Sequence, residues 1–168
     1  EAGIIAGLFG LMNLFARALG GFFSDKVNRS FGLQGRVLVL ALFLAGEAVG
    51  LIFFSKSTTL WVAVALMITF AFFLKMANGG TYAVVPFVNK RAVGLVSGIV
   101  GAGGNVGAML FGFMFKGSLP WPTVLFILGI VIACIAALTP LIRFGKEENA
   151  GSFAVAPTPI HPKPSLGT

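Results

Sequence analysis

The chain has 168 residues, of which 57% are hydrophobic and only 10% are charged, and its mean hydropathy is +0.98. This apolar surplus far exceeds what a soluble domain of this size needs, so the composition excludes an ordinary soluble protein and indicates a lipid environment. The formal charge of +7 would favour nucleic-acid partners in a soluble protein, but here most basic residues lie between apolar runs, so we expect no nucleic acid among the partners.

Five apolar stretches follow one another along the chain, each about long enough to cross a hydrocarbon core of roughly 30 Å as a helix. We expect spans at 3–23, 37–55, 60–87, 93–115 and 123–142. Together they make up a partial transmembrane domain at 1–144. The alternating pattern of a membrane β-barrel is missing. The sequence therefore predicts an all-α polytopic membrane protein embedded in a lipid bilayer.

Loop charges predict the orientation of the spans. The segments after the first, third and fifth spans carry most of the basic residues: Lys26, Arg29, Arg36, Lys90, Arg91, Arg143 and Lys146. The opposite loops carry only Lys56 and Lys116. Because loops rich in lysine and arginine stay on the cytoplasmic side, the ends after spans one, three and five are expected to be cytoplasmic.

Residues 145–168 differ in composition from the rest of the chain. They are polar and contain four prolines, a composition that cannot bury a core and favours extended chain. The sequence predicts a disordered cytoplasmic tail, in which His161 is a solvated bystander. The single Cys134 allows no intrachain disulfide and excludes a metal site built on thiols.

Small residues spaced by four recur in the spans, and this spacing lets helices approach closely in lipid. The pairs are Gly3 and Gly7, Gly46 and Gly50, Gly94 and Gly98, and Gly103 and Gly107. We expect tight helix packing at these pairs, with an additional role in substrate binding only in the fourth span.

Arg17 is one of three charged residues within the spans, and such a charge costs about 2.5–3.5 kcal/mol at a helix centre. It lies some 10 Å from the expected cytoplasmic end of its helix, so snorkelling to the membrane surface is an alternative to a functional role. Its helix face also carries Asn13, Gly20 and Gly21, a small and polar surface that suits a cavity better than lipid. A guanidinium in a cavity offers paired planar donors, which indicates a small oxyanion as substrate.

The fourth span is dense in glycine around Ser97 and Asn105, with six glycines between 94 and 107. Such a density weakens a helix unless close backbone approach compensates for it. It permits tight packing, local unwinding, or direct exposure of backbone N–H groups and of the Asn105 amide to an anion. We assign Gly101, Gly104 and Asn105, with Arg17 and Asn13, to a candidate substrate site.

Glu47 and Lys75 are the other two charges within the spans. Adjacent antiparallel helices could bring them together as a buried ion pair, which is the structural interpretation. The functional interpretation makes Glu47 a proton carrier, because a buried carboxyl group can load and release a proton within a transport cycle.

Two segments carry a resemblance to a known family. Residues 21–26, which read GFFSDK, look like the cytoplasmic loop motif of the major facilitator superfamily, with Gly21, Asp25 and Lys26 in place and its basic ending delayed to Arg36. Residues 15–21 (FARALGG) and 98–107 (GIVGAGGNVG) resemble the nitrate/nitrite porter family, particularly its plant and algal high-affinity members. The resemblance covers the chain to about Phe144.

The resemblance implies helices 8 to 12 of a twelve-helix fold and nitrate, or nitrite, as the transported anion. It also implies proton-coupled symport by alternating access in nitrate assimilation, in the plasma membrane. One arginine from each half would clamp the anion; Arg17 matches that of the C-terminal half, and its counterpart would lie in a missing N-terminal half. The implied partners are the anion, protons, that half and an accessory membrane protein. No cofactor or metal is implied.

Other functions stay open at this point. The protein could be a porter for another small anion, such as a carboxylate, or a non-transporting membrane fragment that serves only assembly. An enzyme is not expected, because no span contains a metal-ligand cluster or paired carboxylates.

Overall fold

The computed structural model describes residues 2–144, with side chains from Met12 onward. This part of the chain forms α1 (Ala2–Ser55), α2 (Leu60–Val88), α3 (Val93–Lys116), α4 (Trp121–Leu138) and the short 3-10 helix η1 (Thr139–Leu141). The expected all-α fold is confirmed for the described residues. The tail expected at 145–168 lies outside them.

All four α-helices are long and apolar enough to cross a membrane. In lipid the backbone N–H and C=O groups have no water to bind, and a helix pairs them within one segment. The described residues form four such helices rather than the five expected spans, because the first two expected spans belong to the single element α1.

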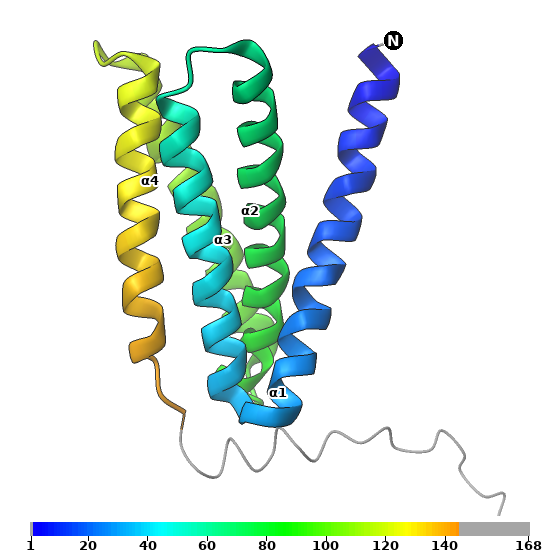
Figure 1. Cartoon of the computed structure of the whole chain (residues 1–168). Helices are drawn as coiled ribbons and strands as arrows, with labels where there is room; N and C mark the ends of the chain where they lie inside the picture. The colour runs from blue at the N-terminus through cyan, green and yellow to red at the C-terminus, as the bar shows by residue number, and fades with distance from the viewer. Residues whose placement is uncertain (1, 145–168) are drawn as a thin grey trace, which may run out of the picture.

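The element α1 bends back on itself at Gly32, whose φ of 63° lies in the left-handed region. Its two arms, 2–31 and 33–55, run in opposite directions (Figure 1). The loop expected between Ser24 and Arg36 is therefore wrong, since both arms stay helical up to this single residue. Glycine tolerates a positive φ at no steric cost, which explains how the chain reverses within one residue.

The last helix is also shorter than the expected span 123–142. It ends at Leu138 and tightens into η1 before Ile142. Pro140 lacks an N–H group and its ring crowds the preceding turn, which disfavours continuation of the α-helix. Gln34 Nε2 donates a hydrogen bond to the carbonyl oxygen of Pro140, at 3.3 Å, and so ties this end to the second arm of α1.

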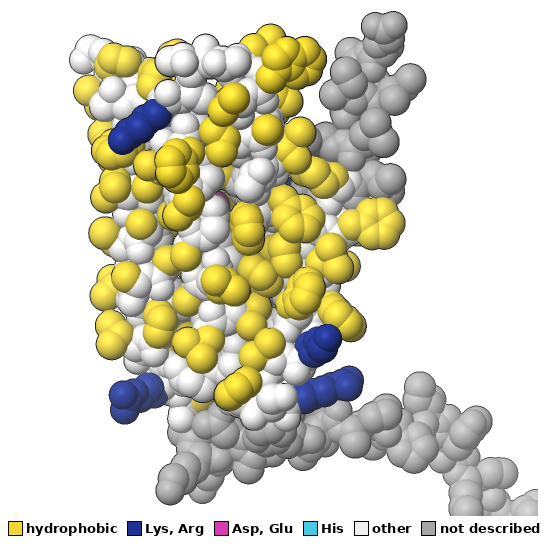
Figure 2. All heavy atoms as spheres, viewed as in Figure 1, with side chains coloured by type: hydrophobic (Ala, Val, Ile, Leu, Met, Phe, Trp, Pro, Cys, Tyr) yellow, Lys and Arg dark blue, Asp and Glu magenta, His cyan; other side chains and the backbone are white. Residues whose placement is uncertain are grey.

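The turn at Gly32, the α2–α3 connection and the end of η1 lie at the same end of the bundle (Figure 1). Hydrophobic side chains cover much of the middle of the visible face, and lysine and arginine side chains lie toward its ends (Figure 2). This arrangement agrees with the alternation expected from the loop charges.

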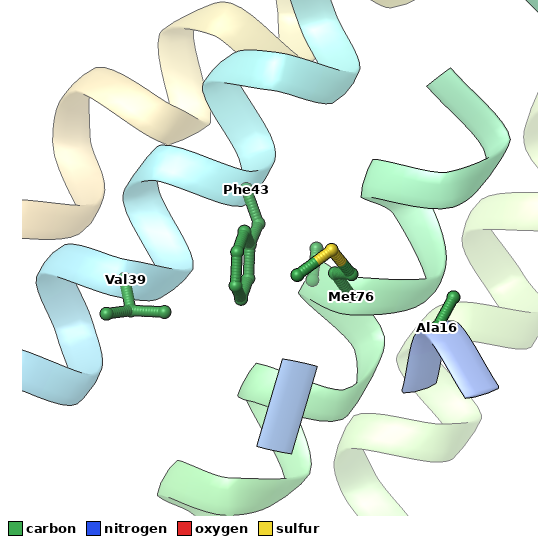
Figure 3. Close-up of a cluster of buried hydrophobic side chains, with 5 residues drawn as sticks. Ala16, Val39, Phe43 and Met76 are labelled. Atoms are coloured by element: carbon green, nitrogen blue, oxygen red, sulfur yellow. The ribbon is translucent and has the colours of Figure 1, made fainter. Parts of the chain in front are cut away.

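The best-packed part of the bundle joins both arms of α1 to α2. Ala16 from the first arm, Val39 and Phe43 from the second, and Met76 and Ala77 from α2 form one buried cluster (Figure 3). The second arm also packs closely on its neighbours through glycine. A Cβ atom at Gly46 or Gly50 would meet the phenylalanines of α2 at 2.7 and 2.9 Å, which confirms the close approach expected for that pair.

The helix α3 is packed differently from the others, because none of its residues is buried. A Cβ atom built at Gly94, Gly98, Gly103 or Gly107 would meet nothing within 4 Å. The tight packing expected at these two pairs is therefore wrong within the described part of the chain. The pair Gly3 and Gly7 lies where no side chains are described.

Candidate functional site

The first arm of α1 and α2 approach closely enough for their backbones to touch. A Cβ atom at Gly20 would clash with the carbonyl oxygen of Met76, and one at Gly79 with the carbonyl oxygen of Arg17. Only glycine permits this approach at both positions. The backbone contact sets Arg17 directly beside the middle of α2.

The guanidinium of Arg17 lies over the ring of Tyr82, with its Cζ atom 4.9 Å from the ring centroid. Such a cation–π contact contributes about 0.5–2 kcal/mol, depending on desolvation. The arm continues to the turn at Gly32, so about 21 Å of helix, at about 1.5 Å per residue, separates Arg17 from that turn. This is twice the distance expected from the sequence, and the head group is directed toward α2, so the contact argues against snorkelling.

An open cavity of about 670 Å³ lies between α2 and α3, next to this contact. Its α2 wall carries Lys75, Asn78, Thr81 and Tyr82, and its α3 wall carries Val100, Gly101, Gly104, Asn105 and Ala108. A Cβ atom at Gly101 would lie 3.6 Å from the hydroxyl oxygen of Tyr82. Tyr82 therefore contacts Arg17 through its ring and approaches the glycine-rich wall of α3 through its hydroxyl group.

Four of the five residues assigned to the substrate site come together in this way. Gly101, Gly104 and Asn105 line the cavity, and Arg17 borders it through Tyr82. Asn13 does not line the cavity. It lies one turn before Arg17, where its Oδ1 atom is buried and has no hydrogen-bond partner within the described part of the chain.

The sequence interpretation missed Tyr82 and assigned Lys75 to an ion pair. A signal was present, since Lys75, Asn78 and Tyr82 are spaced i, i+3 and i+7 and so share one helix face. This polar stripe faces the cavity.

Glu47 is buried in the second arm of α1, with 6% of its surface exposed. It forms no ion pair with Lys75, because the ion pair between Arg36 and Asp25 is the single one among the described residues. No hydrogen bond to Glu47 occurs among these residues either. The structural interpretation of Glu47 as one half of a buried pair is therefore wrong within this part of the chain.

The loop motif lies at the end of the bundle where α1 turns. The Nη1 atom of Arg36 pairs with Asp25 Oδ1 at 2.5 Å and donates a second hydrogen bond to the carbonyl oxygen of Ala83 at 3.2 Å. Its guanidinium also lies over the ring of Phe87, 4.9 Å from the centroid. The arginine therefore joins both arms of α1 to the last turns of α2. Neither Gly21 nor Lys26 takes part in these contacts.

Comparison with known proteins identifies the architecture. The family model of the Major Facilitator Superfamily matches residues 1–166. This chain belongs to the major facilitator superfamily. The superfamily assignment and the apolar helices make it an integral, multi-pass membrane protein.

The chain is also similar to individual members of this superfamily. It is 45% identical over 118 residues to the high-affinity nitrate transporter 2.5 of Arabidopsis thaliana, which covers 70% of this chain and 24% of that protein. It is 43% identical over 122 residues to the nitrate transporter 2.1 of Chlamydomonas reinhardtii, covering 71% of this chain and 22% of the relative. A nitrate/nitrite transporter, NrtP of Picosynechococcus, is 39% identical over 113 residues, which make up 66% of this chain and 20% of that relative.

The resemblance to the nitrate/nitrite porter family is thereby confirmed. The chain spans about a quarter of the length of the curated relatives that it matches. No solved structure matches it with comparable significance.

Proposed function

We propose that this chain is the C-terminal part of a secondary transporter that carries nitrate, and also nitrite, across a membrane by alternating access. The observation that carries the proposal is the contact of Arg17 with Tyr82 at the edge of a cavity walled by glycine and asparagine. Arginine presents several N–H donors in one plane, which match the planar oxygens of nitrate. Gly101 and Gly104 leave room for the anion to reach the backbone of α3.

The chain offers only part of the machinery that transport needs. We infer that a preceding N-terminal half supplies a second arginine and a second glycine-rich helix, and that this half covers the exposed glycines of α3. The two arms of α1 together with α2, α3 and α4 would then be helices 8 to 12 of twelve, in the plasma membrane. The end of the bundle that carries the turn at Gly32 and the α2–α3 connection would face the cytoplasm. Residues 145–168 would follow as the cytoplasmic tail.

Uptake by the full-length protein in proteoliposomes tests the substrate. Labelled nitrate should accumulate, unlabelled nitrite should compete with it, and a small carboxylate such as formate should not. Uptake of labelled formate without uptake of labelled nitrate would favour a porter for another anion. If the upstream sequence contained no second arginine within a span, and no uptake of any anion occurred, the chain would instead be a non-transporting membrane subunit.

We further propose that protons drive the uptake and that Glu47 carries them. Burial without an ionic partner in the described residues supports this role, because a carboxyl group in that setting exchanges its proton more readily than a paired one.

Replacing this carboxyl group by an amide separates coupling from binding. In a Glu47→Gln variant, nitrate uptake driven by an inward proton gradient should fall to the level without a gradient, because glutamine cannot carry a proton. Exchange of internal for external nitrate should continue at the wild-type rate, because it needs no net proton movement. Both rates can be followed with labelled nitrate in the same proteoliposomes. A normal response to the gradient would exclude Glu47 as the carrier.

A further inference from the structure

Lys75 occupies the middle of α2, where a positive charge has no evident structural purpose. About 20 Å of helix, at about 1.5 Å per residue, separates it from either end of α2 (Leu60–Val88). A lysine side chain is too short to carry its ammonium to the membrane surface from there. The side chain is half-buried and reaches the cavity between α2 and α3.

No acidic group neutralises this lysine within the described part of the chain. Lys75 forms neither an ion pair nor a hydrogen bond there. The cavity lining contains no aspartate or glutamate, and its other polar side chains are the neutral Asn78, Thr81, Tyr82 and Asn105. With Arg17 at the border, the cavity therefore has two cations and no lining carboxylate.

A cavity with one sign of charge and low-dielectric walls concentrates ions of the opposite sign. The two cations differ in what they offer an anion. Arg17 is held on the ring of Tyr82 and presents a fixed fork of donors. Lysine presents a compact charge on a flexible stem, which can follow an anion as it moves.

We propose that Lys75 is a second anion-binding cation of the cavity and contacts the bound nitrate through its Nζ ammonium. This inference rests on the proposed function, since it adds a residue to the substrate site of that transporter. The ammonium lies on the same α2 face as Asn78 and Tyr82, so the anion would sit between this stripe and Gly101 and Gly104 of α3.

Equilibrium binding of nitrate to the purified full-length protein, measured by titration calorimetry, tests the role of Lys75. Lys75→Met keeps the length of the side chain and removes its charge. It should raise the Kd for nitrate about tenfold or more, which corresponds to about 1.4 kcal/mol. Lys75→Arg should restore most of the affinity. The matched control is Lys116→Met on α3, whose ammonium lies over the ring of Phe113 outside the cavity; it should bind nitrate like the wild type.

The outcomes separate this inference from the proposed function. A wild-type protein that transports and binds nitrate, with an unchanged Kd in Lys75→Met, overturns the role of Lys75 and leaves the function intact. A wild-type protein that binds no nitrate overturns the function itself. The melting temperature of the protein without ligand identifies a structural role of Lys75. If Lys75→Met lowers the melting temperature while the Kd for nitrate stays the same, the lysine pairs with an acidic residue elsewhere in the protein. The inference is then wrong.

Discussion

Replacing Arg17 by lysine is expected to reduce nitrate uptake by about 10- to 100-fold, although the positive charge is kept. Hydrogen bonds to charged groups contribute about 1.5–3 kcal/mol, and a single ammonium cannot reproduce the paired, planar donors of the guanidinium. The lysine would also lack the rigid plane that lies on Tyr82. Initial rates of labelled nitrate uptake in proteoliposomes measure the effect.

The matched control for this substitution is Arg91→Lys. Arg91 is exposed in the short connection between α2 and α3 and does not line the cavity, so this variant should transport at the wild-type rate. Both variants must be present in the membrane at equal amounts, as judged by immunoblot. Wild-type uptake by Arg17→Lys would mean that Arg17 does not contact the anion and serves only to anchor α1.

Enlarging Gly79 by one methyl group is expected to disrupt both the fold and the site. A Cβ atom at this position would overlap the carbonyl oxygen of Arg17, a backbone atom that cannot rotate away. Overpacking of this kind costs typically about 1–3 kcal/mol, and separating the helices would move Arg17 away from Tyr82. Gly79→Ala should therefore lower the melting temperature in detergent and reduce nitrate uptake at least as much as Arg17→Lys.

The adjacent residue supplies the control for Gly79→Ala. A Cβ atom at Gly80 would lie 3.7 Å from Leu40 and Phe43, which is ordinary van der Waals contact. Gly80→Ala should therefore be tolerated, and the higher helix propensity of alanine, by about 1 kcal/mol, offsets any small packing cost. Equal effects of the two substitutions would show that the close approach at Gly79 is unimportant.

Much of the architecture could be predicted from the apolar runs, because each is long enough to cross the bilayer and is followed by polar residues. The reversal of α1 at Gly32 could not be predicted from the sequence. Residues 24–36 are polar enough for a loop and also compatible with helix, and only the positive φ of Gly32 decides between them. The depth of Arg17 was underestimated for the same reason, since the expected helix ended too early.

The site could be predicted in part. Arg17 and the glycine-rich span follow from the cost of a charge within a membrane span and from the density of glycine. The contact between Tyr82 and Arg17 could not be predicted, because it depends on which helix Arg17 faces. That pairing is determined by the backbone contact at Gly20 and Gly79, and the sequence alone does not show which of many glycines approach another helix.

The two walls of the cavity differ in how firmly they are held. The α2 wall is anchored in the buried cluster formed with Ala16 and Phe43. The α3 wall has no buried residue in the described part of the chain, so among these residues a displacement of α3 would withdraw no side chain from a packed interior. Within the described helices, the volume of the cavity would therefore change by displacement of α3, while the guanidinium of Arg17 stays on the ring of Tyr82.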